Sequence, residues 1–341
     1  MILTLVGVSY GTLDASARRA KGVGADILVR PPGTSALSLS SAPTPDKLVT
    51  LLGQRDGVEI STGTVVQPLT GFDTLTGIDY PVLSRMSGGF KFLEGGPFQQ
   101  EDDVIVDEYY AKQKKVHPGD HLMLANHNWR VSGVFESGKL ARICTKIDVL
   151  QRITNNEGKV SQIYLKLKNP NDAQNFSVEL KKYMNPGDPD HGYQIYTIEE
   201  YTSLLTVSSL GMLKDFIGVV IGVAAIVGFI VVFMAMYTAV LERTREIGIL
   251  KAVGAGPGYI LNILFRETIL LAVVGTIFGI VLTYGTQWLM LHAVPASLVQ
   301  ETVYEWWPIA GAIAIVGALL GTIVPAARAV KQDATEALSY E

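Results

Sequence analysis

The sequence is short of several features that would place it in a common functional class. Its single cysteine, Cys144, excludes a disulfide bond within the chain. The formal net charge of −4 gives no support for binding to nucleic acid. The H-E-x-x-H motif does not occur, and the G-x-S-x-G match at Gly7–Gly11 lies within the apolar N-terminal run rather than at a strand-to-helix turn, so hydrolase chemistry of those two kinds finds no support. Between Asp14 and Leu213 no apolar run is long enough to cross a membrane, which takes roughly 20 residues.

Two partial motifs lack the residues that their chemistry needs. Gly133–Leu140 nearly matches the phosphate-binding loop G-x-x-x-x-G-K-[ST], but Leu140 replaces the hydroxyl residue that would hold Mg²⁺. His117, His121 and His127 fall within eleven residues without cysteines or clustered acids, which favours surface histidines over a metal site. We therefore expect no catalytic, metal-binding or cofactor-binding residue and no cofactor.

Three apolar runs have the length of membrane-spanning helices: Phe216–Val240, Thr268–Leu291 and Trp306–Val324. The first thirteen residues are apolar but too short to span. We expect them to be the back half of a truncated first transmembrane helix, and a poor signal peptide is the alternative. The mean hydropathy of +0.28 agrees with membrane spans joined to one sizeable soluble part.

Basic residues are concentrated in some of the short loops. The loop before Trp306 has no lysine or arginine, whereas the connection between the first two long runs and the C-terminal tail are both basic, with Arg243, Arg245, Lys251, Arg266, Arg328 and Lys331. By the positive-inside rule the connection and the tail are cytoplasmic, so the segment before the first long run is extracytoplasmic.

The predicted fold class is therefore membrane α-helical, with four helices of which the first is truncated, and with an inserted extracytoplasmic α+β domain. We divide the chain as follows: partial transmembrane helix 1–13, extracytoplasmic domain 14–195, stalk helix 196–215, transmembrane helix 216–240, cytoplasmic helix and turn 241–267, transmembrane helix 268–291, external loop 292–305, transmembrane helix 306–324 and cytoplasmic tail 325–341. The stalk helix is expected to run without a break from Tyr196 to Leu241.

Within the extracytoplasmic domain, alternation and turn residues predict strands at 26–30, 58–69, 77–82, 103–106, 121–124, 129–135 and 162–167. Helices are predicted at 108–115, 143–153 and 171–184, and another beginning with Thr44 as its N-cap. A turn at Asn126–Asn128 is expected to join two of the strands.

The connection Leu241–Gly258 has the pattern of a short amphipathic helix that ends at Gly254. One face is charged and suits a partner, and the other is apolar and suits the neighbouring membrane helices. A solvated loop that merely satisfies the positive-inside rule is the alternative. The spans carry almost no ionisable residues near their centres, which argues against an ion-coupled transporter and requires another source of energy.

The run V-L-E-R-T-R-E-I-G-I-L-K-A-V-G-A, from Val240 to Ala255, closely resembles the hallmark of the MacB/FtsX-type ABC transporter permeases, the type VII or mechanotransmission class. The tail from Pro325 is similar to the family's usual ending, except that Ala334 stands where a proline is common. Weaker similarities begin at Gly24, Gly77, Phe92 and Gly119.

This resemblance implies a non-catalytic permease subunit in a bacterial inner membrane, served by a cytoplasmic ABC ATPase dimer. The permease would be a homodimer or heterodimer in contact with membrane lipid, with a periplasmic membrane-fusion adaptor as a candidate further partner. The implied contacts with the ATPase are Glu242, Arg243, Arg245, Glu246, Ile247, Gly248, Lys251 and Gly254. The implied function is ATP-driven export or extraction of a substrate; the alternatives are an FtsX-like regulator of a periplasmic or cell-wall hydrolase and a stand-alone membrane sensor.

Overall fold

The computed structural model describes residues 1–33, 43–69, 73–186, 192–293 and 299–331 of the chain. These residues form two compact units, which we describe separately. The helical unit comprises Met1–Ser9, Gly211–Leu289 and the residues from Gln300 onward. The sheet unit comprises Tyr10–Leu210 and Met290–Val299.

The sheet unit is built on one large mixed sheet with strand order β12-β1-β11-β3-β4-β9-β6-β8-β5, and β7 pairs with β8. Most neighbours are antiparallel, but β4 pairs in parallel with β9 and β6 with β8. The strands are β1 Ile27–Arg30, β3 Val58–Pro68, β4 Thr74–Ile78, β5 Phe92–Gly95, β6 Asp103–Asp107, β7 His121–Leu124, β8 His127–Phe135, β9 Ile143–Lys146, β11 Gln162–Leu167 and β12 Gln194–Thr197. The short strands β2 Thr44–Pro45 and β10 Lys159–Val160 form a separate pair.

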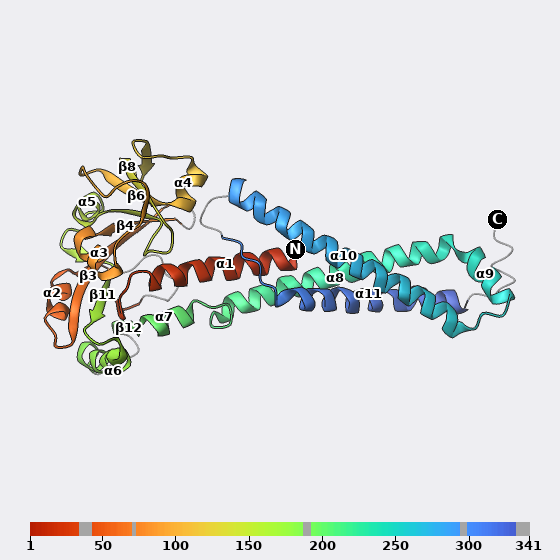
Figure 1. The fold of residues 1–341 in the computed structure, drawn as a ribbon. Helices are drawn as coiled ribbons and strands as arrows, with labels where there is room; N and C mark the ends of the chain where they lie inside the picture. Colours follow the sequence, from red (N-terminus) through yellow and green to blue (C-terminus); the bar gives the residue numbers. More distant parts are fainter. Residues whose placement is uncertain (34–42, 70–72, 187–191, 294–298, 332–341) are drawn as a thin grey trace. The chain divides into compact units, whose positions relative to one another are not determined.

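Short helices cover this sheet (Figure 1): α2 Lys47–Gly53, α3 Tyr80–Ser87, α4 Glu108–Lys114, α5 Ile147–Ile153, α6 Ala173–Met184 after the 3₁₀ turn Pro170–Asp172, and α7 Ile198–Leu204. Three apolar clusters fill the interior; Trp129, Phe135 and Ile163 are fully buried, one in each cluster. Burial of these large side chains is the main favourable contribution to folding of the unit.

In one ion pair of the sheet unit, the acidic partner is buried. The carboxylate of Asp103 accepts from Arg130 Nε at 2.8 Å and from Nη2 at 2.9 Å. It also accepts from the backbone N–H groups of Gln99 and Gln100, at 2.6 and 2.7 Å. Burial of Asp103 works against ionisation, but the hydrogen bonds from Arg130 and the backbone lower the pKa of this carboxyl below its ordinary value.

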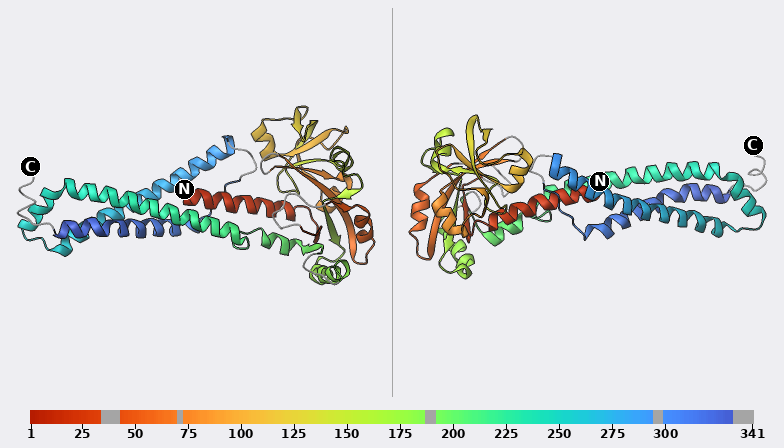
Figure 2. Two further views of the ribbon diagram at one scale, coloured as in Figure 1. Left: turned by 180° about the vertical axis from the view of Figure 1, so that it is seen from behind. Right: turned by 45° about the horizontal axis from the view of Figure 1, so that its top comes forward.

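The helical unit contains α8 Gly211–Glu242, α9 Thr244–Ala252, α10 Pro257–Ala293 and α11 Trp306–Lys331, together with the first residues of α1 Ile2–Lys21. By length and composition, α8, α10 and α11 could each cross a membrane. Helices α8 and α11 lie side by side (Figures 1 and 2), and a Cβ atom on Gly321 would lie 3.0 Å from the carbonyl oxygen of Phe229. This glycine therefore permits the close approach of the two helices.

The predicted unbroken helix from Tyr196 to Leu241 is wrong. Tyr196 belongs to β12, α7 ends at Leu204, and α8 begins at Gly211. In the break, the hydroxyls of Thr206 and Ser209 both donate to the carbonyl oxygen of Ser203, at 3.1 and 2.9 Å. These side-chain hydrogen bonds replace the backbone bonds that a continuing helix would make.

Two predictions in the sheet unit were wrong because strand pairing prevails over local pattern. Ile143–Lys146, predicted as helix, is strand β9, because it pairs with Leu75–Ile78 in the centre of the sheet, and only Ile147–Ile153 is helical. Thr44 is not a helix N-cap: it pairs with Val160, and α2 begins at Lys47.

Two other predicted boundaries are shifted. The strand predicted at 77–82 ends at Ile78, because the Asp79 side chain accepts from Val82 N and starts α3 with Pro81 in its first turn. The turn between β7 and β8 is at Ala125–Asn126, where both residues have positive φ, of 51° and 59°. The strands predicted at 26–30, 58–69, 103–106, 129–135 and 162–167 and the helices at 108–115 and 171–184 are confirmed to within a few residues.

Candidate coupling site

The candidate site is the nine-residue helix α9 between α8 and α10. It ends in two backbone hydrogen bonds, from Ala255 N to Leu250 O at 2.9 Å and from Gly254 N to Lys251 O at 3.0 Å. Gly254 has a φ of +100°, which a residue with a side chain adopts only with strain. This is the Schellman termination of a helix, and Pro257 then opens α10.

The inner face of α9 consists of Thr244, Ile247, Gly248 and Lys251, at the spacing of one helix face. Ile247 is only 7% exposed, and it belongs to a cluster drawn from all three long helices: Met236, Val240, Ile260, Leu264, Ala326 and Ala329. The Lys251 ammonium donates to the carbonyl oxygen of Val330 in α11 at 2.7 Å. These contacts attach α9 to α8, α10 and α11 together.

A charged contact reinforces the attachment to α10. Arg243, between α8 and α9, donates through Nη1 to both carboxylate oxygens of Glu267, at 3.0 and 3.2 Å. A small cavity of about 80 Å³ adjoins this pair, and its lining includes Glu246, Leu250 and Ile263. Both partners of the ion pair remain partly exposed, so it contributes about 1 kcal/mol or less to stability and serves mainly to orient the helices.

The outer face of α9 consists of Arg245, Glu246, Ile249 and Leu250, and it is extended by Glu242 before the helix and Val253 after it; all six are exposed. Ile249 is 49% exposed and Val253 is 85% exposed. Exposed apolar side chains bordered by charges of both signs are typical of a surface that binds another protein.

The eight residues predicted as ATPase contacts are thus divided between two faces. Glu242, Arg245 and Glu246 lie on the outer face and Gly254 is exposed at the turn. Ile247, Gly248 and Lys251 belong to the inner face, while Arg243 pairs with Glu267. Ile247 and Gly248, predicted among the ATPase contacts, are buried within the chain.

Ile249, Leu250 and Val253 are exposed, unlike Ile247, but they were not among the residues predicted as ATPase contacts. The spacing contains the signal that separates them. Thr244, Ile247 and Lys251 repeat at three and four residues, and Glu246, Ile249 and Val253 repeat in the same way one third of a turn or more away. Two helical stripes are present instead of one.

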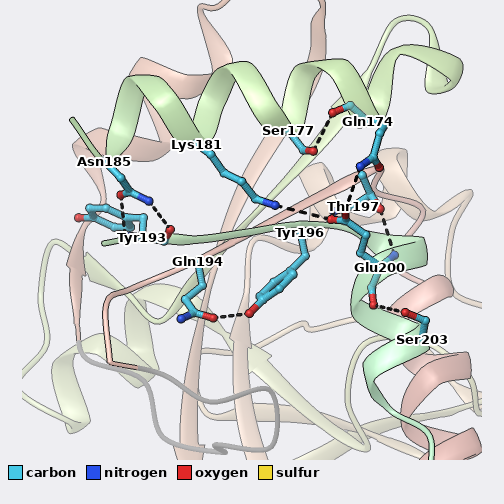
Figure 3. A network of polar contacts seen from close by, with 10 residues as sticks. All are labelled: Gln174, Ser177, Lys181, Asn185, Tyr193, Gln194, Tyr196, Thr197, Glu200 and Ser203. Atoms are coloured by element: carbon cyan, nitrogen blue, oxygen red, sulfur yellow. Dashed lines mark hydrogen bonds and ion pairs between the residues drawn. The ribbon is translucent and has the colours of Figure 1, made fainter. Parts of the chain in front are cut away.

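The sheet unit holds the helix that leads to α8 through a polar network (Figure 3). Thr197 caps α7: its Oγ1 accepts from Glu200 N at 3.0 Å, and Glu200 Oε2 accepts from Thr197 N at 3.1 Å. From α6, Gln174 donates to Glu200 Oε1 at 3.0 Å and the Lys181 ammonium lies 3.9 Å from Oε2. Glu200 therefore joins the start of α7 to α6.

The carboxyl end of α1 is also fixed within the sheet unit. A Cβ atom on Gly22 would lie 1.7 Å from the carbonyl oxygen of Gly138, so only glycine allows this approach. Leu140 N donates to Arg19 O at 3.0 Å, and Lys139 Nζ donates to Ser87 O at 2.5 Å. The chain thus enters and leaves the sheet unit through two rigid attachments.

No group of three or more His, Cys, Asp or Glu side chains is arranged to hold a metal ion in the part of the chain that the structure describes. His117 is exposed and pairs with Glu94 at 3.0 Å, and His127 pairs with Asp102 at 2.8 Å. Cys144 is fully buried, and burial raises its pKa.

Comparison with known proteins identifies the family. Residues 218–334 match the model of the FtsX-like permease C-terminal domain, which covers α9 and the three long helices almost completely. Residues 218–334 belong to the FtsX-like permease family. This confirms the resemblance found in the sequence.

Relatives of this permease are named as ABC transporter components. It is 29% identical to the uncharacterized ABC transporter permease MJ1507 of Methanocaldococcus jannaschii, over 67% of this chain and 59% of that protein. It is 30% identical to the uncharacterized ABC transporter permease YknZ of Bacillus subtilis, over 53% of this chain and 45% of that protein. It is 27% identical to the macrolide export ATP-binding/permease protein MacB of Escherichia coli K12, over 74% of this chain and 41% of that protein. The chain spans about half the length of these relatives.

Two solved structures match the permease more distantly. One is the extracellular domain of the noncanonical ABC-type transporter YknZ, with 17% identity and a TM-score of 0.38 over 50% of this chain and 98% of that one. The other is the periplasmic region of MacB from Actinobacillus actinomycetemcomitans, with 16% identity and a TM-score of 0.41 over 54% of this chain and 94% of that one.

Proposed function

We propose that a separate cytoplasmic ABC ATPase, acting as a dimer, binds the outer face of α9 and drives the extracytoplasmic domain of this permease. The observation that carries the proposal is the division of α9 into two faces. The inner face is fixed to α8, α10 and α11, whereas the outer face presents Ile249 and Val253 to a partner. Such a helix can transmit a displacement because it cannot move without the helices to which it is attached.

The path of transmission is supported by the continuity of α8. Its 32 residues extend about 48 Å at 1.5 Å per residue, enough to cross the membrane with turns to spare. Beyond it, residues 205–210 separate α8 from α7, and the Glu200 network fixes α7 to the sheet unit. Movement at α9 would therefore reach the sheet unit as a pull or rotation on α7.

We also propose that the helical unit contains four membrane helices, with α1 as the first. In support, Met1, Ile2 and Leu3 line a groove of about 470 Å³ on α8, α10 and α11. Most of its other walls are small residues that allow a further helix to approach closely, among them Ala224, Gly228, Ala272, Gly275, Gly279, Ala314 and Gly317.

In the proposed topology, α9 and the C-terminus are cytoplasmic, the sheet unit is outside, and the membrane is a bacterial inner membrane. The basic loops support this orientation. The names of the relatives support export or extraction of a substrate over regulation of a hydrolase, since MacB and PvdT are named as export proteins. The permease would act as a homodimer or heterodimer, and an adaptor protein and membrane lipid remain candidate partners.

Co-purification with the ATPase from membranes of the native host tests the proposal. Ile249→Glu and Val253→Glu, alone and together, should abolish co-purification, because each places a charge on the apolar part of the outer face. Val178→Glu in α6 is the matched control, since Val178 is 45% exposed and lies in the sheet unit. Co-purification of the double variant at the wild-type level would contradict the proposed contact.

A further inference from the structure

The sheet unit contains a pocket of about 800 Å³ that plays no part in the proposed coupling. It lies between the end of β3, the start of β4, α4, the β7–β8 hairpin and the end of α5. Its volume is in the range of pockets that bind small molecules. The apolar walls include Leu69, Leu122, Leu124 and Ile153, which are the half-buried edge of the cluster around Trp129.

Asp73 lines this pocket and is 9% exposed. Its Oδ1 atom is buried and has no hydrogen-bond partner among the residues that the structure describes. Buried carboxylate oxygens are nearly always paired, because an unpaired one carries the full cost of its lost hydration. Burial raises the pKa of Asp73, although the positive charges of Arg142, Lys114 and Arg19 act in the opposite direction.

Lys114, on α4, lines the same pocket and is exposed at its edge. Asp73 and Lys114 are the two side chains with opposite charges in this lining, which also includes Tyr110. Gln67, Asn126 and Thr154 add amide and hydroxyl groups. The lining therefore offers one anionic acceptor, one cationic donor and several apolar side chains.

From this arrangement we infer that the pocket binds a small zwitterion, with its ammonium group on Asp73, its anionic group near Lys114 and an apolar body against Leu122 and Ile153. The ammonium group would donate to the unpaired Oδ1. Two oppositely charged ligand groups leave the net charge of the pocket unchanged, whereas a simple cation or anion would pair with one side chain only. This site is independent of the contact proposed for α9.

The test is calorimetric titration of the full-length protein in lipid nanodiscs with 6-aminohexanoate, hexylamine and hexanoate. These probes share the apolar body and differ in their charged ends. We expect 6-aminohexanoate to bind about tenfold more tightly than either single-charge probe, the effect of one additional charged hydrogen bond. Equal affinity of the three probes, or no saturable binding of 6-aminohexanoate, would overturn the inference.

Two variants assign the ends of the ligand. Asp73→Asn should remove the advantage of 6-aminohexanoate over hexanoate, and Lys114→Gln should remove its advantage over hexylamine. Lys112→Gln is the control, because Lys112 lies on the same helix, is exposed and pairs with Glu108 outside the pocket. If Asp73→Asn fails to fold, Lys114→Gln decides: an unchanged preference for 6-aminohexanoate over hexylamine in that variant would refute the proposed site.

Discussion

Truncating Ile247 to alanine should loosen α9 without removing the surface proposed to bind the ATPase. The side chain is 7% exposed and packs among Val240, Leu264 and Ala326. Removing three buried carbon atoms costs about 2 to 3 kcal/mol, from roughly 0.8 kcal/mol for each group plus a small cavity term. The substitution should lower the free energy of local opening of α9, because Ile247 is the residue of this helix in the apolar cluster with α8, α10 and α11.

The assay is amide hydrogen exchange of the full-length protein, measured by mass spectrometry. A loss of 2 to 3 kcal/mol should accelerate exchange across Thr244–Ala252 by about 30- to 150-fold. Exchange in the middle of α8 should not change. Unaltered protection of α9 would refute the conclusion that Ile247 holds this helix.

Ile249→Ala is the matched control, because it deletes the same atoms two residues away from a side chain that is 49% exposed. It should change the free energy of opening measured by exchange by no more than about 0.5 kcal/mol, the usual range for exposed positions. Binding of the ATPase should respond in the opposite order, with Ile249→Ala weakening it more than Ile247→Ala. If both variants weaken binding equally, the outer face has no separate role.

Three further predictions concern the sheet unit. Asp103→Asn breaks the buried ion pair and should lower the free energy of unfolding in urea by about 3 kcal/mol, whereas Glu101→Gln, in an exposed pair, should change it by about 1 kcal/mol or less. Burial raises the pKa of Asp107 from 3.8 to about 6, so the folded state binds this proton more tightly than the unfolded state. Stability from this group is therefore present below pH 3.8 and lost as the pH rises towards 6, and Asp107→Asn should remove that part of the urea-unfolding pH profile. Gly22→Ala should destabilise the unit by about 3 kcal/mol or more, because the new methyl group would overlap a backbone carbonyl, whereas Gly218→Ala in α8 meets no neighbour and should be neutral or stabilising in thermal melts.

The apolar runs and the strongly alternating strands could be predicted because each follows from a local period. Gln162–Leu167 alternates along one half-buried strand, and 216–240 is apolar throughout, so neither needs information from elsewhere in the chain. Ile143–Lys146 could not be predicted in this way. Its conformation depends on pairing with Leu75–Ile78, about 70 residues earlier.

The candidate site shows the same limit. Charge and helical period indicated a partner surface at α9, and Glu242, Arg245 and Glu246 do lie on its outer face. The spacing separates two stripes on α9, but which stripe faces inward depends on the positions of α10 and α11. The break after Leu204 depended on hydroxyl hydrogen bonds that a hydropathy pattern cannot detect.

Site-specific photocrosslinking tests the central claim most directly. Cys144 is fully buried and its burial disfavours the reactive thiolate, so Val253→Cys provides one accessible thiol for a benzophenone label. Irradiation of native-host membranes should then join the permease to an ABC ATPase, while a label at Val178→Cys should not. Equal crosslinking from both positions, or an ATPase crosslink from Val178→Cys alone, would contradict the proposal that the ATPase binds the outer face of α9.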